Sequence, residues 1–213
     1  MRYDLVVFDV DGTLFDTSEG IFSAVDMTTD SEGLERIPRS ELRTYIGPPL
    51  ARSFMRTYGV DANEAERLAR VYRGFYMERF SGLAVMYPGI PELLDRIRDA
   101  GARMSVVTHK YEVSAKELLD RFGILGHFDG VYGCDSEGLP GKASCIRKCL
   151  SDTNVRKDRC VMVGDSISDL EGANGAGVDF IGALYGFGFD ACKKYDFPVC
   201  RSAYEIREQL MDN

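Results

Sequence analysis

The chain of 213 residues is 45% hydrophobic and contains only 7 prolines, a composition typical of a globular protein that buries a sizeable core. Its 34 acidic and 26 basic residues give a formal net charge of −8, so we expect neither nucleic acid nor a membrane as a partner. Any anionic substrate would need a local positive site. No signal peptide is readable at the N-terminus and no apolar segment approaches the length of a membrane span, so we expect a cytoplasmic protein.

The N-terminal segment predicts a buried strand that ends on acidic residues. The apolar run from Asp4 to Asp9 predicts the strand, and Asp11 and Gly12 follow at once. Asp-Gly is a frequent turn dipeptide, so solvated turn acids are the simplest interpretation of this segment alone.

The segment between residues 16 and 88 has a different character, with no credible strand. It carries amphipathic helical stretches such as SELRTYIG and NEAERLARVYRGFYMERF, broken at Pro38 and at the pair Pro48 and Pro49. We predict a small all-helical cap domain over residues 17–85, inserted after the first strand. Its two connections would then lie beside the carboxyl end of that strand.

From Pro88 onward the pattern is β-α repeated. The further predicted strands are short, apolar and not cleanly alternating, and they cover residues 102–108, 128–133, 159–165 and 179–184. The segments between them have helical periodicity. We therefore predict an α/β core domain over residues 1–16 and 86–213: a Rossmann-like open, mainly parallel sheet with helices on both faces, whose ligands bind at the carboxyl ends of the strands.

Acidic residues end two of the predicted strands. Asp9 and Asp165 would meet at one edge of the sheet, with Asp11 in the turn close by, and uncompensated carboxylates would repel one another. Mg²⁺ resolves this repulsion, because it takes a few carboxylates, keeps waters and accepts a phosphate oxygen. The Thr108 hydroxyl and the ammonium groups of Lys110 and Lys142 add an anion cradle, which indicates phosphoryl transfer with a carboxylate nucleophile.

The six cysteines lie in the C-terminal part of the chain without a CxxC pair or a neighbouring histidine cluster, so we expect no zinc site. Cys145 and Cys149 share a helical face. We interpret the cysteines as reduced, partly buried thiols, and His127 as a structural residue.

These motifs together resemble the haloacid dehalogenase-like hydrolases of the phosphoglycolate phosphatase type. DVDGTLFDT looks like the first signature of that family, VVTHK the second, the lysine of GKAS the third and VGDSISDLEGANGAG the fourth. The resemblance covers essentially the whole chain, including the helical cap and the GALYGFG segment after the last signature.

The resemblance implies a role for each matching residue. Asp9 would be the nucleophile that forms an aspartyl-phosphate, and Asp11 the general acid and base. Thr108 and Lys142 would hold the phosphoryl oxygens. Asp165, together with Asp9 and the backbone carbonyl of Asp11, would hold Mg²⁺.

The resemblance implies supporting roles as well. Asp169, a helical turn beyond Asp165, would orient a metal-bound water or Lys142 rather than bind metal directly, and Ser166 would support the site with it. Gly12 would let the chain turn and bring backbone amides toward the phosphate. Many relatives have Lys-Pro where Ala143 follows the lysine here, which leaves Lys110 as the alternative phosphate ligand.

Two further positions bear on substrate binding. His109 stands where serine or asparagine is commoner and is either a spacer or a substrate contact. The run YIGPPLARSF is either a link between cap helices or a specificity loop, in which Gly47 and Arg52 would contact the substrate, with Arg52 facing a carboxylate or a second phosphate.

We therefore expect a Mg²⁺-dependent phosphomonoester hydrolase acting on a small phosphorylated metabolite, as a monomer or homodimer. Phosphoglycolate is the first substrate to consider, followed by nucleoside monophosphates and pyrophosphate. A hexose-phosphate mutase shares every motif, and a phosphate-sensing protein without turnover is a third possibility. Dehalogenase relatives lack an acid at the position of Asp11, which disfavours that activity.

Overall fold

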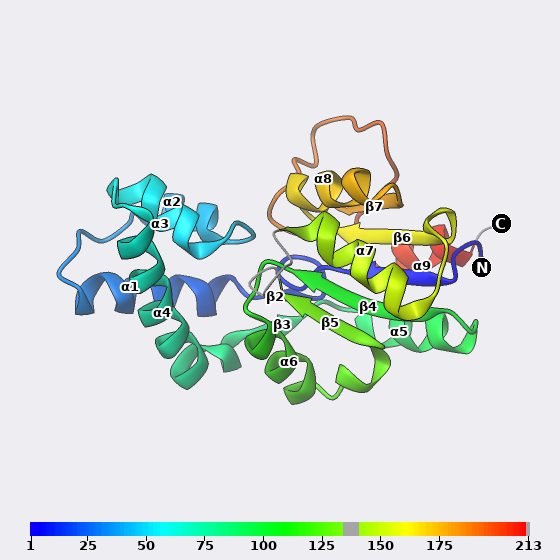
Figure 1. Ribbon diagram of the computed structural model, residues 1–213, viewed down its shortest axis with the longest axis horizontal. Coiled ribbons are helices and arrows are strands. Elements are labelled where there is room, and N and C mark those ends of the chain that lie inside the picture. The colour runs from blue at the N-terminus through cyan, green and yellow to red at the C-terminus, as the bar shows by residue number, and fades with distance from the viewer. Residues whose placement is uncertain (134–140, 212–213) are drawn as a thin grey trace. The chain divides into compact units, whose positions relative to one another are not determined.

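The computed structural model describes residues 1–133 and 141–211, and it divides into two compact units. An α/β unit consists of Met1–Phe15 and Met86–Asn213, and a helical unit consists of Asp16–Val85. The short strands β2 (Phe15–Asp16) and β3 (Val85–Met86) pair with each other where the chain passes between the units (Figure 1).

The α/β unit contains a six-stranded sheet in the order β5-β4-β1-β6-β7-β8, and every recorded pairing is parallel. Its elements in chain order are β1 (Leu5–Phe8), α5 (Ile90–Asp99), β4 (Arg103–Thr108), α6 (Glu112–Arg121), β5 (Gly130–Gly133), α7 (Lys142–Thr153), β6 (Cys160–Gly164), α8 (Ile167–Ala176), β7 (Asp179–Ala183), β8 (Val199–Cys200) and α9 (Ala203–Met211). This arrangement confirms the predicted fold class.

Helices cover both faces of this sheet. Helices α7 and α8 pack together on one face, and α5 and α6 lie on the other (Figure 1). Side chains of the central strand β1 are therefore fully buried, and on the α7 side Leu5 and Val7 join a core that includes Cys145, Cys149 and Cys160. Burial on both faces explains the continuous apolar runs of the sequence, since neither face of these strands meets water.

The cysteines within the described residues are all free. Cys200 is buried like the three in the core, whereas Cys192 is exposed. Cys134 lies outside the described residues.

The helical unit contains α1 (Ser18–Ser31), α2 (Arg39–Leu42), α3 (Leu50–Tyr58) and α4 (Ala62–Phe75), which a π-helical turn over Tyr76–Phe80 extends. Helix α1 approaches this turn closely, because a Cβ atom on Gly20 would lie 2.7 Å from the carbonyl oxygen of Phe80. At the other end of α4 the side chain of Asp61 caps the helix by accepting a hydrogen bond from the Glu64 amide. No helix in the described part of the chain has the length and apolar character needed to cross a bilayer.

The observed strands lie within two residues of the five that the sequence predicts, but three short strands were not predicted. β2, β3 and β8 have two residues each, too few to show any periodicity. The run YIGPPLARSF also differs from a simple link, because α3 begins at Leu50, directly after Pro49. A proline before the first turn is compatible with a helix start, since the first helical amides have no intrahelical acceptor.

Candidate active site

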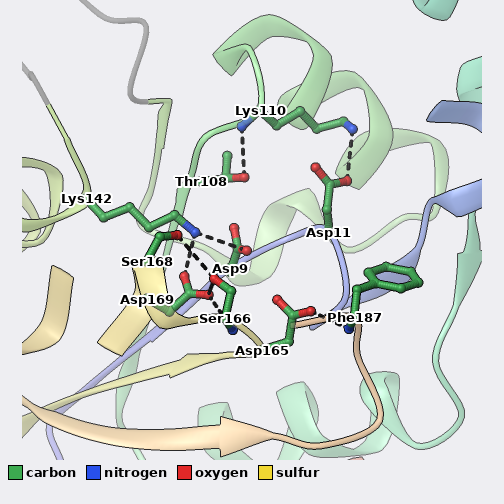
Figure 2. Close-up of polar contacts among 10 residues, drawn as sticks. All are labelled: Asp9, Asp11, Thr108, Lys110, Lys142, Asp165, Ser166, Ser168, Asp169 and Phe187. Atoms are coloured by element: carbon green, nitrogen blue, oxygen red, sulfur yellow. Dashed lines mark hydrogen bonds and ion pairs between the residues drawn. The ribbon is translucent and has the colours of Figure 1, made fainter. Parts of the chain in front are cut away.

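The carboxyl ends of three neighbouring strands bring most of the predicted site residues together. In β1, Phe8 pairs with Val106 of β4 and with Val163 of β6, so Asp9, Thr108 and Asp165 follow at the same edge of the sheet. All three side chains are buried. Figure 2 shows them with Lys142, Asp169, Asp11 and Lys110 around one centre.

Lys142 reaches this centre from the first position of α7. Its side chain is only 2% exposed, and its Nζ lies 3.1 Å from Asp9 Oδ2 and also donates to Asp169 Oδ1 (Figure 2). Burial acts to lower the pKa of Lys142, but Asp169 and Asp9 outweigh it, so the pKa of Lys142 lies above its ordinary value. Lys142 is therefore a fixed cation at the bottom of the site.

Asp169 holds Lys142 in place. Its Oδ2 accepts hydrogen bonds from the amide and the hydroxyl of Ser166, which completes a capping box at the start of α8, while its Oδ1 faces the lysine. A Cβ atom on Gly164 would lie 2.3 Å from Asp169 Cγ, so glycine at this position allows the Asp169 side chain to approach the end of β6. The geometry is that of an orienting residue.

The carboxyl groups of Asp9 and Asp165 lie in an environment that disfavours their ionised forms unless a cation binds. Burial raises the pKa of Asp9 to about 7 despite the opposing charge of Lys142, and burial together with the charges of Asp169 and Asp9 raises the pKa of Asp165 to about 8. Asp9 Oδ1 is buried and has no hydrogen-bond partner. Such an oxygen is costly to bury unless a ligand satisfies it.

One group of acidic side chains in the described residues is close enough to share a metal ion. Oxygen atoms of Asp9, Asp165 and Asp169 lie within 4.8 Å of one another. With Asp11 they make four carboxylates facing two lysines, which leaves two formal negative charges uncompensated when all are ionised. The set fits a hard dication with oxygen ligands.

The second lysine of the site pairs with the second acid. Lys110 Nζ lies 3.0 Å from Asp11 Oδ1, and both side chains are at most 10% exposed. The Lys110 amide also donates to the Thr108 hydroxyl oxygen. That oxygen accepts this bond, and the hydroxyl hydrogen can donate toward a ligand. The structure thus places both candidate lysines in the site, on different acids.

The turn after β1 differs in detail from the expected amide cradle. Gly12 has φ 84°, but its amide donates to the Phe15 carbonyl and the Thr13 amide donates to the Val10 carbonyl. The need for glycine here is steric, because a Cβ atom would lie 2.1 Å from Asp165 Oδ2. Gly12 thereby allows the turn to pack directly on Asp165.

The loop after β7 lies in the GALYGFG segment and has a role that the sequence motifs do not predict. The Phe187 amide donates to Asp165 Oδ2 over 2.6 Å (Figure 2), and the Tyr185 hydroxyl donates to the Thr13 carbonyl over 2.9 Å. An aromatic residue between two glycines just beyond a strand end is the signal that could have identified this loop.

The remaining predicted residues are placed as follows. His109 is half-buried and follows Thr108 directly. Gly47 and Arg52 belong to the helical unit: Gly47 has φ 97° in the turn before α3, and Arg52 is exposed in the first turn of that helix. His127 lies outside the site, where its Nε2 contacts Asp95 and Arg98, two residues of α5.

Comparison with known proteins places this site in a family. The model of the haloacid dehalogenase-like hydrolase family matches residues 6–183. A 5′-nucleotidase of Pseudomonas aeruginosa is 37% identical over 88% of this chain and 86% of its own. A phosphoglycolate phosphatase of Aquifex aeolicus is 29% identical over 98% of this chain and 97% of its own.

Two further similarities widen the range of named functions. The tyrosine-protein kinase PtkA of Mycobacterium tuberculosis is 35% identical over 86% of this chain, which spans only 63% of that protein. The crystal structure of a predicted phosphatase from Clostridium acetobutylicum superposes with a TM-score of 0.88 and 31% identity over 99% of both chains. With the family match over most of its length and the phosphatases among its relatives, the chain belongs to the haloacid dehalogenase-like hydrolase family and is a phosphatase of that family.

Proposed function

We propose that the protein is a Mg²⁺-dependent phosphomonoester hydrolase in which Asp9 is the nucleophile. The observation that carries this proposal is the state of the Asp9 carboxylate. Its Oδ2 faces Lys142, its Oδ1 is buried without a hydrogen-bond partner, and Asp9 belongs to a group of acidic residues that could share a cation. A carboxylate needs no deprotonation by a base before it attacks phosphorus once a cation favours its ionised form.

Asp9 and Asp165 would hold the metal, with the backbone carbonyl of Asp11 as a further ligand, and Asp169 would orient Lys142 rather than bind metal directly. The raised pKa values of Asp9 and Asp165 support this, because a dication is what would favour both ionised forms in a buried site. When bound, Mg²⁺ supplies charge stabilisation to the transferring phosphoryl group.

The reaction would proceed in two displacements at phosphorus. A bond forms between an Asp9 oxygen and phosphorus while the bond to the leaving oxygen breaks, and Asp11 protonates that oxygen. Asp11 then accepts a proton from water as the water attacks phosphorus, which releases inorganic phosphate and restores Asp9. Lys142 and the Thr108 hydroxyl would hold phosphoryl oxygens, and Lys110 would hold Asp11 in place between the steps.

The helical unit would select the leaving group. Arg52 is exposed and has no acidic partner among the described residues, so its guanidinium is available to a substrate carboxylate or second phosphate. Phosphoglycolate is the first substrate that we propose. Nucleoside 5′-monophosphates are the second, because a 5′-nucleotidase is among the relatives, at 37% identity.

Release of inorganic phosphate from a panel of phosphorylated metabolites, with Mg²⁺ and with EDTA, tests the proposal. We expect hydrolysis of at least one panel member only with Mg²⁺, and full activity in EDTA would contradict the metal role. Product analysis of hexose phosphates separates hydrolysis from phosphoryl transfer between hydroxyls. Phosphate binding without any turnover would instead identify a sensor.

Asp11→Asn tests the general acid. We expect it to slow hydrolysis of an alkyl phosphate by about 10²-fold or more, and of an aryl phosphate with a good leaving group far less, since an acidic leaving oxygen needs little protonation. Equal losses on both substrates would contradict the assignment of Asp11.

A further inference from the structure

We propose that residues 184–188, the loop LYGFG after β7, form a positioning clamp that holds Asp165 and the turn after β1 at the separation required for metal binding. The proposal rests on the metal site of the proposed function and adds residues from a further segment of the α/β unit, the loop after β7. We call residues 184–188 the clamp loop.

The clamp loop contacts Asp165 through its backbone. The Phe187 amide donates to Asp165 Oδ2 over 2.6 Å, which satisfies one carboxylate oxygen and fixes the rotation of the group (Figure 2). Gly188 packs closely against the backbone of the same residue, since a Cβ atom on Gly188 would be 2.7 Å from the Asp165 carbonyl oxygen. The loop thus holds both the side chain and the main chain of Asp165.

The same loop also contacts the turn that follows the nucleophile. The Tyr185 hydroxyl donates to the Thr13 carbonyl over 2.9 Å, and the Tyr185 ring packs edge-on against Tyr87 with centroids 4.7 Å apart. Gly186 lies between the two partners: a Cβ atom on it would be 2.4 Å from both the Gly12 carbonyl oxygen and Asp165 Cβ. No side chain fits at this position without moving one of them.

The need for such a clamp follows from charge. Asp9 and Asp165 repel each other when ionised, and the backbone pairing of β1 with β6 ends just before their side chains, with the hydrogen bond from the Asp9 amide to the Val163 carbonyl. Beyond that pairing, the clamp loop touches both sides. It therefore organises the acidic group before the cation arrives, and the cost of bringing the carboxylates together is met by folding rather than by metal binding.

Mn²⁺ binding followed by electron paramagnetic resonance of the free ion tests the proposal without relying on turnover. Tyr185→Phe removes the hydroxyl and keeps the ring, and we expect it to raise the Mn²⁺ dissociation constant about tenfold, the range for groups that support metal ligands indirectly. The Mg²⁺ concentration for half-maximal activity should rise by a similar factor, while the rate at saturating metal stays within about threefold of wild type.

Tyr195→Phe is the matched control. The Tyr195 hydroxyl bonds to the backbone of Asp190 in the same connection between β7 and β8, and it touches neither Asp165 nor the turn after β1. We expect unchanged Mn²⁺ affinity for this variant. An equal loss in both variants would show general loosening of the connection and would overturn the proposal.

Gly186→Ala should have the larger effect, about 100-fold in Mn²⁺ affinity, provided that circular dichroism shows a folded protein. If this variant does not fold, Tyr185→Phe decides. Wild-type affinity in Tyr185→Phe overturns the clamp while leaving the proposed function intact. Folded wild-type protein that binds no Mn²⁺ overturns the metal site itself, and the clamp with it.

Discussion

The two units of the protein differ in whether they bury charged groups. In the α/β unit, Lys142 and Asp9 are each at most 3% exposed on their side chains and face one another at a buried centre. The helical unit, Asp16–Val85, contains nine arginines and no lysine, and ion pairs such as those of Arg36 and Arg39 are exposed to solvent. Loss of one partner of a buried ion pair strongly destabilises the folded protein. Exposed ion pairs are screened by solvent, so their residues can be substituted at little cost in stability. The chemistry should therefore depend on the first unit and substrate choice on the second.

The largest expected effect is that of Asp9→Asn. The amide keeps the shape of the carboxylate but is a poor nucleophile, so we expect turnover to fall by about 10⁴-fold or more at saturating substrate. Release of inorganic phosphate measures the loss, and circular dichroism checks that the fold is retained.

Asp158→Asn is the matched control, because Asp158 is an exposed acid that pairs with Arg156. It should retain wild-type turnover. Activity of Asp9→Asn within tenfold of wild type would rule out the nucleophile assignment.

Lys142→Met tests the buried charge itself. Removal of the cation leaves Asp9 and Asp169 uncompensated at full burial, which should destabilise the folded protein by about 3 to 5 kcal/mol as well as abolish activity. Denaturant unfolding measures the change. Lys148→Met, which breaks an exposed pair with Asp152, should leave the unfolding midpoint unchanged. Similar unfolding midpoints for the two variants would contradict the claim that the buried lysine contributes more to stability than the exposed one.

The sequence predicted which side chains meet at the buried centre, because these residues directly follow apolar strands. Asp9 and Asp165 each follow an apolar run, and the neighbours of β1 in the sheet bring those ends together with Thr108. The sequence also identified both candidate lysines. It did not predict which acid each lysine would face, because that depends on the path of the chain after β4 and at the start of α7.

The parts that sequence did not predict depend on close approach rather than on periodicity. The clamp loop acts through a backbone amide and through missing Cβ atoms, as at Gly186, and neither leaves an apolar pattern. The start of α3 at Leu50 was hidden by two prolines that usually break a helix. The role of Arg52 depends on how the helical unit meets a substrate, which no local pattern encodes.

The response to pH distinguishes a metal centre from an ordinary acidic cluster. Folding raises the pKa values of Asp9 and Asp165 from 3.8 to about 7 and about 8, so the folded metal-free protein binds more protons than the unfolded chain at intermediate pH. Its stability should therefore fall as pH rises from 6 to 8, by on the order of 2 kcal/mol. Thermal unfolding in EDTA measures this slope.

Mg²⁺ competes with those protons, so the gain in melting temperature on adding Mg²⁺ should be larger at pH 8 than at pH 6. Asp165→Asn should flatten the slope in EDTA. A metal-free protein that becomes more stable as pH rises over this range would contradict the raised pKa values of Asp9 and Asp165.

The smallest effect, and the one that tests the helical unit, is that of Arg52→Ala. Because Arg52 is exposed at the start of α3, its loss should not affect folding or the chemistry at Asp9. For phosphoglycolate, whose carboxylate would pair with the guanidinium, we expect kcat/KM to fall about tenfold, the value of one charge-assisted hydrogen bond. A small aryl phosphate offers no partner and should be hydrolysed at the wild-type rate. Arg52→Lys keeps the charge without the planar fork and should lie between the two. An equal loss on both substrates would mean that Arg52 supports the helical unit itself, and no loss on either would mean that Arg52 does not contact the substrate.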